Sequence, residues 1–423
     1  MTSKYTPSIY RLPSINVEDM YKTSDVLIGT NINQPLFSIG FHSFIHRTKT
    51  AMDITNKLET KNKFYYVVNP FESTINDYPE DLSHIAPTYL VMKNEEILSR
   101  SFYKMWEMLT MFDIANKPAM TMVGIAEGPG SFIQAFIKYR EKFHDISKDK
   151  IHGITMYPSD NRYIDFNLTN KYPKIISLYK TTNKEGMDGD ITDITMINNF
   201  KASIDKKADL ITADGMVSRS TTNNYIEQES YNLFFGEILT ALKIQAKDGN
   251  FILKIFDTFT NITIKLLYLL SSFYEDTYIY KPYFSRTTSS EKYIVCCKFK
   301  DDKDLDKKIK HLEKVFIQLK TTKFVMDIFP KFTLSIPNIN VFKYINILLA
   351  NEMQISINML VQYIKSNNYF GDEYHTYRLK QINATKWWIS TYFSETKVDF
   401  TKLIKDTVHY NDSELNLFVN KLL

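Results

Sequence analysis

Cysteine is almost missing from this chain: among 423 residues only Cys296 and Cys297 occur, side by side in an apolar run. Two adjacent cysteines build neither a disulfide framework nor a four-ligand zinc site. Their scarcity excludes a disulfide-stapled secreted domain and a structural zinc module, and it indicates a reducing compartment.

Glycine and proline are also scarce, with 12 and 13 residues, and long apolar runs are missing. No window reaches the roughly 18 apolar residues of a membrane helix. The amino terminus, MTSKYTPSIYRLPS, lacks the basic stretch and apolar core of a secretion signal. With 44% hydrophobic and 24% charged residues, the composition is that of a folded chain. We therefore expect a soluble intracellular protein. The sequence does not distinguish the nucleus from the cytoplasm, and the cytoplasm here includes a viral factory or virion.

A large excess of one charge is missing too, since the formal net charge is only +4. This value neither shows nor excludes a nucleic-acid partner, because a basic groove fits inside a balanced total. Evidence for function must therefore come from sequence motifs and not from the overall charge.

The length favours a central domain with additions, because 423 residues exceed one ordinary core. Residues 1–94 are expected to form an irregular N-terminal extension, since prolines break every long periodic pattern there. These prolines are Pro7, Pro13, Pro35, Pro70, Pro79 and Pro87. We expect the central domain over 95–300 and a helical C-terminal region over 301–423. Its helices are expected near 302–320, 340–366, 377–393 and 412–422.

Within the central part, short apolar runs alternate with segments of helical periodicity. Such alternation is typical of an α/β, Rossmann-like fold with a mostly parallel sheet covered by helices on both faces. The last two runs are joined by about ten residues without a helix, which predicts an antiparallel terminal pair. Helices are expected at 94–111, 131–143, 228–246 and 260–274, and strands at 119–126, 151–156, 208–213, 250–256, 277–281 and 292–299.

A glycine turn, EGPGSF, follows the first of these strands and opens a helix; it comprises Glu127, Gly128, Pro129, Gly130, Ser131 and Phe132. Glycines let a ligand approach the backbone, and a helix start favours a carboxylate or phosphate. NAD is disfavoured, because Ile133 stands where G-x-G-x-x-G needs its third glycine, and no P-loop is present. Glu127 suits the ammonium of S-adenosylmethionine, although an ordinary tight connection explains the turn equally well.

Four polar residues are expected at one edge of the sheet. Asp214 follows the strand ADLITA, and ligands of open α/β sheets bind at the carboxyl ends of strands. Lys254 lies inside NFILKIF, where a lysine is costly unless it faces a cleft or an acid. Glu291 begins the last, antiparallel strand, and Lys104 lies in the helix that precedes the first strand. Taken singly, Lys104 and Lys254 are also explained as surface residues.

Together these residues give two ammonium groups and two carboxylates with coupled pKa values. Lys254 is placed to accept or orient a hydroxyl proton. The arrangement suits a direct methyl displacement, in which the protein aligns the reactants and excludes water without a covalent intermediate.

These motifs resemble the FtsJ-like family of RNA 2′-O-methyltransferases, and within it the cap-specific mRNA (nucleoside-2′-O-)-methyltransferases of eukaryotes and large DNA viruses. The resemblance is ordered along about 200 residues, from 95 to 300. It runs through SFYKMWEM, EGPGSF, GDIT, ADG, LKIFD and SRTTSSEKYIV.

The resemblance implies a catalytic Lys-Asp-Lys-Glu tetrad on Lys104, Asp214, Lys254 and Glu291, with Lys254 acting on the 2′-OH. It implies that the glycine turn, Asp214 and Asp190 of GDIT hold S-adenosylmethionine, with Asp190 near the adenine. It implies RNA as partner, namely the capped 5′ end of mRNA, with a capping enzyme or polymerase as a further partner. Arg286 is a candidate contact to RNA phosphate or to the cap.

Two positions depart from the family pattern: Ser131 replaces the second glycine of PGG, and Gly124 replaces an acidic residue near the end of the first strand. Two other functions stay open, the same chemistry on an RNA without a cap and a non-catalytic RNA-binding subunit of a capping or transcription complex. A metal hydrolase is disfavoured, because His42 and His46 have no third ligand and no HExxH motif. With 28 tyrosines and 29 phenylalanines, the sequence does not identify the aromatics that would hold a cap.

Overall fold

A sheet of eight strands organises the protein, whose computed structural model describes residues 5, 7–35, 39–57, 63–71, 97–156, 166–179, 189–217, 225–321, 323–366 and 372–405. The strand order is β1-β8-β9-β7-β6-β3-β4-β5. The strands of this sheet are β1 (Ser8–Arg11), β3 (Thr121–Ile125), β4 (Lys150–Ile154), β5 (Ile176–Leu178), β6 (Ala208–Ala213), β7 (Gln245–Ile255), β8 (Tyr274–Lys281) and β9 (Lys292–Phe299).

The five strands β5, β4, β3, β6 and β7 are parallel, whereas β9 is antiparallel to both of its neighbours, β7 and β8. The order reverses at β3, which lies between β4 and β6, and this reversal is the switch point where open α/β sheets bind ligands. Because β9 is antiparallel, its first residue lies at the edge where the parallel strands end. The expected Rossmann-like fold and antiparallel terminal pair are confirmed.

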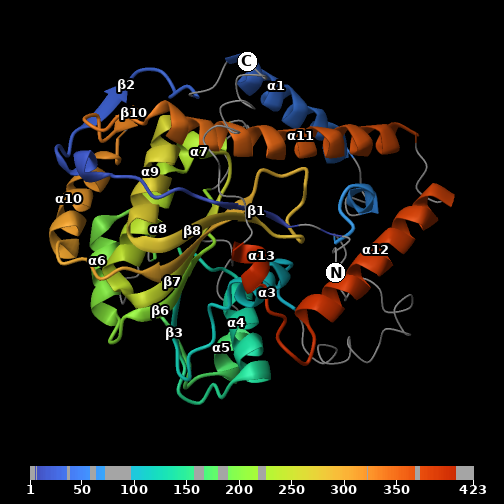
Figure 1. The fold of residues 1–423 in the computed structure, drawn as a ribbon, viewed down its shortest axis with the longest axis horizontal. Helices are drawn as coiled ribbons and strands as arrows, with labels where there is room; N and C mark the ends of the chain where they lie inside the picture. The colour runs from blue at the N-terminus through green and yellow to red at the C-terminus, as the bar shows by residue number, and fades with distance from the viewer. Residues whose placement is uncertain are drawn as a thin grey trace.

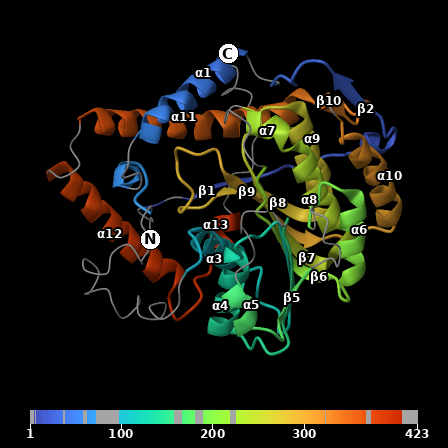
Figure 2. The same cartoon turned by 180° about the vertical axis from the view of Figure 1, so that it is seen from behind.

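Helices cover both faces of this sheet (Figures 1 and 2). One face carries α3 (Ser101–Phe112), α4 (Ser131–Phe143), α5 (Phe166–Lys171) and α12 (Asp372–Tyr392). The other face carries α6 (Ile194–Ser203), α8 (Tyr231–Ile244), α9 (Asn261–Ser272), α10 (Leu305–Gln318) and part of α11 (Ile336–Ser366). Short α7 (Ile226–Glu229) precedes α8, and α13 (Thr401–Lys405) follows α12.

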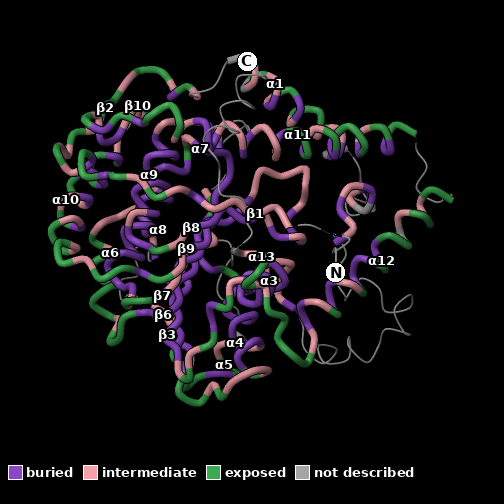
Figure 3. Tube along the Cα trace, viewed as in Figure 1, coloured by how far each residue is buried: buried purple, intermediate pink, exposed green. Residues whose placement is uncertain are grey.

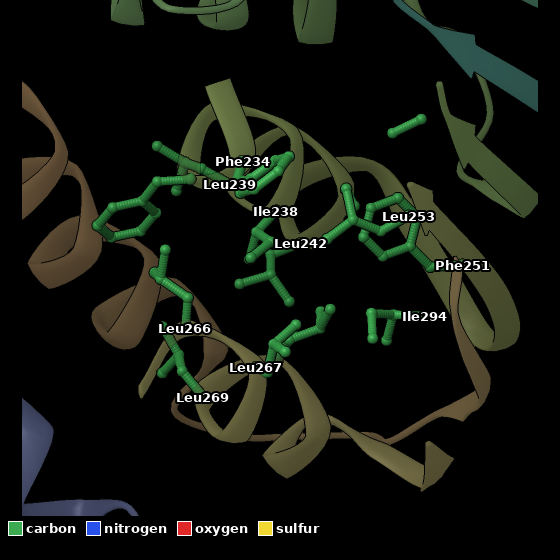
Figure 4. Close-up of a cluster of buried hydrophobic side chains, with 14 of the residues drawn as sticks. Phe234, Ile238, Leu239, Leu242, Phe251, Leu253, Leu266, Leu267, Leu269 and Ile294 are labelled. Carbon is green, nitrogen blue, oxygen red and sulfur yellow. The ribbon is translucent and has the colours of Figure 1, made fainter. Parts of the chain in front are cut away.

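The two faces are filled by alternate residues of the same strands, as the strand period of two requires. In β7, Phe251 and Leu253 belong to the cluster under α8 and α9, whereas Ile252 belongs to the cluster on the α3 face. Figure 4 shows Leu253 near Ile238 and Leu242 of α8. In Figure 3 the buried part of the chain follows the sheet and its flanking helices.

The N-terminal part contains regular structure, so the expectation of an irregular extension was wrong for its described residues. β1 extends the main sheet by pairing with β8, about 270 residues further along the chain. β2 (Val26–Gly29) pairs with β10 (Phe324–Ile328) in a second, two-stranded sheet. Helix α1 (Ile39–Thr50) and the 3-10 helices η1 (Glu18–Tyr21), η2 (Ala51–Lys57) and η3 (Lys63–Val67) complete this part. These elements are short enough to fit between the prolines.

The C-terminal helices at 302–320, 340–366 and 377–393 are confirmed as α10, α11 and α12. The strand β10 in this region and the short β5 were not expected. The helix predicted from residue 94 begins only at Ser101 within the described residues, and the helix predicted at 412–422 lies outside them. Both additions share the core of the central part, since Met20 and Phe342 belong to one hydrophobic cluster with the sheet.

Trp388 of α12 ties the C-terminal region to α3. Its side chain is 1% exposed, its indole N–H donates to Glu107 Oε1 at 2.9 Å, and its ring packs edge-on against Tyr103. Removing it leaves a cavity and takes the indole donor away from Glu107 Oε1, while Oε2 keeps its bonds from Tyr280 and Tyr283.

We expect Trp388→Ala to lower the free energy of unfolding by roughly 3–5 kcal/mol, the usual cost of truncating a buried aromatic. Leu379→Ala on the same helix is the control, because that side chain is 61% exposed; it should change stability by less than about 0.5 kcal/mol. Urea unfolding followed by circular dichroism measures both. Equal midpoints for the two variants would contradict a shared core.

Candidate active site

The edge where the parallel strands end gathers the four predicted polar residues. Lys104 lies in the first half of α3, Asp214 directly follows β6, Lys254 lies near the end of β7, and Glu291 directly precedes β9. The two lysines are buried, at 8% and 7% exposure. A buried ammonium group is costly without a partner, so each must find an anion or a carbonyl.

Two ion pairs satisfy these lysines. Lys104 Nζ lies 2.6 Å from Glu291 Oε1, and Lys254 Nζ lies 3.1 Å from Asp214 Oδ1. Lys254 also donates to the Asp214 backbone carbonyl at 2.6 Å. Each carboxylate accepts one further hydroxyl, from Tyr293 to Asp214 at 3.2 Å and from Ser285 to Glu291 at 3.0 Å.

The charges of the two pairs act on each other. Burial acts to raise the pKa of Glu291, but the ammonium groups of Lys104 and Lys254 outweigh it and lower this pKa to about 2. Burial acts to lower the pKa of Lys254, but the carboxylates of Asp214 and Glu291 outweigh it and raise this pKa above its ordinary value. The sequence did not decide whether burial or the nearby carboxylates control the pKa of Lys254. In the structure the carboxylates prevail, so Lys254 is protonated at neutral pH.

Two further carboxyl groups flank the Lys254–Asp214 pair. Burial, together with the Asp214 carboxylate, raises the pKa of Glu127 to about 8. Burial raises the pKa of Glu237 to about 8 against the attraction of Lys254. Glu237 accepts the Gly215 N–H at 3.1 Å through Oε1, while its buried Oε2 has no hydrogen-bond partner among the described residues.

The glycine turn before α4 presents its backbone rather than its side chains. Gly130 has φ of 102° and precedes the first residue of α4, a conformation that favours glycine. Ser131 Oγ is 2.7 Å from Ser99 Oγ, and the Phe132 ring is fully buried, 5.8 Å from the ring of Tyr293. Glu127 is buried and accepts the Thr212 hydroxyl at 2.6 Å. A ligand at this turn would therefore meet main-chain atoms at the start of a helix.

Asp190 lies beside the end of β4. Gly189 before it has φ of 85°, and a Cβ there would lie 2.0 Å from the Thr155 carbonyl oxygen, so the chain passes directly against that strand end. One carboxylate oxygen of Asp190 accepts the backbone N–H and the hydroxyl of Thr192, at 2.9 and 2.7 Å. The bonds to Thr192 hold the carboxylate in a fixed direction.

A cavity of about 600 Å³ opens beside Lys104 and Glu291. Its wall includes Lys49 of α1 and Tyr65 of η3, so the N-terminal part forms one side of it. Arg286, in the loop between β8 and β9, also lines this cavity, and its guanidinium lies 3.7 Å from the centre of the Tyr65 ring.

This geometry agrees with the comparisons to known proteins. The FtsJ-like methyltransferase family matches residues 97–299. The chain contains an FtsJ-like methyltransferase domain. The resemblance expected from the sequence motifs is therefore confirmed.

Proteins similar to this chain are named as methyltransferases. The cap-specific mRNA (nucleoside-2′-O-)-methyltransferase 2 of Drosophila melanogaster is 26% identical over 76% of this chain and 46% of its own length. The cap-specific mRNA (nucleoside-2′-O-)-methyltransferase 1 of Trypanosoma cruzi is 32% identical over 46% of this chain and 52% of its own. "Probable methyltransferase EP424R" of African swine fever virus is 28% identical over 59% of each chain. The chain thus spans about half the length of these relatives.

The missing acid at position 124 of the FtsJ-like domain has a structural explanation. A Cβ on Gly124 would lie 2.7 Å from Cγ of Glu127 and 3.4 Å from its Cβ. Glu127 therefore fills the space that a side chain at position 124 would enter, and it brings a carboxyl group to the end of β3.

Three neighbours of these four residues, namely Tyr293, Glu237 and Ser285, were not predicted from the sequence, although two of them left a signal there. Tyr293 shares a strand face with Glu291 at a spacing of two, and Glu237 is an isolated acid in the apolar helix YNLFFGEILTALKI. Ser285 gave no signal, because its contact depends on how the loop before Glu291 folds back.

The residues that the structure describes show no group of three His, Cys, Asp or Glu suited to a metal ion. The His42 side chain lies outside the described atoms, and the His46 ring packs edge-on against Tyr225. None of the described helices is long and apolar enough to cross a membrane.

We expect the stability gained from ionised Glu291 to disappear in acid. Its folded pKa of about 2 lies below the ordinary value of about 4.3, so its contribution is present above about pH 4.3 and lost as pH falls toward 2. Wild type should thus be more stable than Glu291→Gln at pH 6.5, and urea midpoints should converge as pH falls to 3.

The same titration in a Lys104→Met background provides the control. Without the nearest cation, the pH-dependent part of the change in urea midpoint caused by Glu291→Gln should shrink. A difference between wild type and Glu291→Gln that is constant from pH 6.5 to 3 would contradict the lowered pKa.

Proposed function

We propose that this protein transfers a methyl group from S-adenosylmethionine to a ribose 2′-OH of RNA, at the first transcribed nucleotide of m7G-capped mRNA. The observation that carries the proposal is the pairing of Lys104 with Glu291 and of Lys254 with Asp214 at the switch-point edge of an FtsJ-like domain. The names of the relatives support the cap as the site of methylation.

In this proposal Lys254 orients the 2′-oxygen. Its ammonium is charged and already directed by two oxygens of Asp214, so it acts first as a hydrogen-bond donor that fixes the oxygen in line for displacement. The Asp214 carboxylate is the adjacent acceptor for the hydroxyl proton. Glu291 stays ionised and holds Lys104, which keeps the local charge fixed while the bond to the methyl carbon forms.

The residues at the edge fit a cationic cofactor. Four carboxyl groups, those of Glu127, Asp214, Glu237 and Glu291, lie around Lys104 and Lys254, with Lys281 also acting on Glu291, and Glu237 Oε2 is buried without a described partner. A positive ligand beside them favours their ionised forms. S-Adenosylmethionine supplies a methyl group activated by a sulfonium; the turn at Gly128–Gly130, Glu127 and Asp190 would hold it.

The cavity beside Lys104 fits a nucleotide substrate, because its volume of about 600 Å³ is within the usual range for ligand sites. Lys49, Arg100 and Arg286 on its wall provide cations of the kind that contact phosphates. Arg286 and Tyr65, in contact through the guanidinium and the ring, offer flat groups of the kind on which an RNA base packs. Residues from the N-terminal part thereby belong to the proposed substrate site.

Lys254→Ala should lower kcat by about 100-fold or more, the usual effect of losing a group that acts in the transition state. The measurement uses labelled S-adenosylmethionine with matched m7GpppN-capped, GpppN-capped and uncapped RNAs. Lys247→Ala, at the opposite end of β7 and exposed, should retain wild-type activity.

Label on the first ribose of m7G-capped RNA alone supports the full proposal. Label on uncapped RNA would redirect the activity to another RNA. No transfer to any RNA by the wild-type protein would contradict an enzyme and favour a non-catalytic RNA-binding subunit.

Asp190→Ala should weaken S-adenosylmethionine binding by about 10–100-fold, as expected for loss of a hydrogen bond to an ionised group. Calorimetric titration measures it without RNA. Asp193→Ala is the control, because that carboxylate caps α6 by accepting the Thr195 N–H; its affinity should match wild type. Equal losses in both variants would show that the effect comes from helix stability.

A further inference from the structure

Lys281, the last residue of β8, has no role in the site as described so far. Its ammonium donates to the backbone carbonyls of Ser289 and Glu291, at 2.7 and 2.9 Å. It thus closes the base of the loop that runs from β8 to β9. That loop contains Arg286 and ends at Glu291.

Charged groups from several elements face Lys281. The Glu291 carboxylate and Glu352 of α11 attract its ammonium, whereas Lys104 and Lys292 repel it. A small cavity between the loop and α11 is lined by Lys281 together with Leu349 and Met353 of that helix. The ammonium is therefore held against two carbonyls in a partly buried, mixed polar and apolar environment, where losing these hydrogen bonds would be costly.

The other contacts of Glu291 are few and depend on the loop. Its carboxylate accepts from Lys104 and Ser285, its backbone carbonyl also accepts the Ser285 hydroxyl at 3.1 Å, and its backbone N–H donates to the Ser289 hydroxyl at 3.2 Å. Ser285 and Ser289 belong to the same loop, so neither fixes the loop relative to the sheet. Lys281, on β8, connects the sheet to the end of the loop. The start of the loop is held from α3, where Glu107 accepts the Tyr283 N–H, and by Arg100, which donates to the Phe284 carbonyl.

We propose that Lys281 is a positioning residue for methyl transfer: through the carbonyls of Ser289 and Glu291 it sets the Glu291 carboxylate against Lys104. The inference rests on the proposed function for its kinetic part, whereas its structural part is independent of any activity. Burial lowers the pKa of Lys281 to about 7 against the attraction of Glu291, because desolvation disfavours the charged form.

The test compares Lys281→Met and Lys281→Arg with Lys300→Met. Lys300 follows β9 at the opposite edge and likewise donates to a backbone carbonyl, that of Ser272 at 3.0 Å, so it controls for loss of such a bond away from the site. Hydrogen exchange of peptides covering 282–291 reports the loop, and kcat and KM report transfer to capped RNA. Lys281→Gln, which keeps N–H donors without the charge, replaces the Met variant if that variant does not fold.

We expect faster exchange over 282–291 and a kcat reduced by about 10–100-fold in Lys281→Met, since a displacement of roughly 1 Å has this effect. KM for S-adenosylmethionine should change less than about threefold, because Glu291 acts mainly on the transition state. Lys281→Arg should recover part of the lost kcat, and Lys300→Met should match wild type in both measurements.

Unchanged exchange together with unchanged kcat in Lys281→Met would overturn the inference, as would equal effects in Lys300→Met. If wild type transfers no methyl group, the proposed function fails, and the exchange of 282–291 still decides whether Lys281 positions the loop.

Discussion

Two lysines buried at one edge of a parallel sheet impose the main constraint on this structure. An ammonium group inside a protein must be neutralised locally, and here Lys104 and Lys254 each take a carboxylate from a different strand end. This requires β6 and β7 to end, and β9 and α3 to begin, at the same level. The antiparallel direction of β9 is part of the same requirement, because it brings Glu291 to that level.

The carboxyl groups around these ion pairs influence which cofactor the edge of the sheet would bind. Glu127 and Glu237 stand beside Lys254 with pKa values raised to about 8 by burial. A neutral cofactor would gain little from such neighbours, whereas a cation shifts both carboxyl groups toward their ionised forms. The proposed use of S-adenosylmethionine therefore follows from the balance of charges at the edge as well as from the glycine turn.

The regions outside the FtsJ-like match take part in building this edge. Helix α11 packs against α1 through Met353 of α11 and Ile45 of α1. It packs against η3 through Leu360 of α11 and Phe64 of η3. Figures 1 and 2 both show α1 lying along α11. Since Lys49 and Tyr65 line the cavity, the N-terminal wall of the proposed substrate site is held in place by a C-terminal helix.

The sequence by itself determined the features that depend on local pattern. Apolar runs and helical periodicity predicted 131–143, 208–213 and 292–299 at the bounds that the structure has, and strand ends located Asp214, Lys254 and Glu291 near one edge. Tertiary structure alone decided which lysine pairs with which carboxylate, and it raised the pKa of Lys254. It also placed Glu127 against Gly124 and brought Lys281 into hydrogen bonds with the loop between β8 and β9. It also decided the pairing of β1 with β8. These features arise from contacts between distant segments and from burial, which depend on packing in three dimensions and leave little trace in the spacing of neighbouring residues.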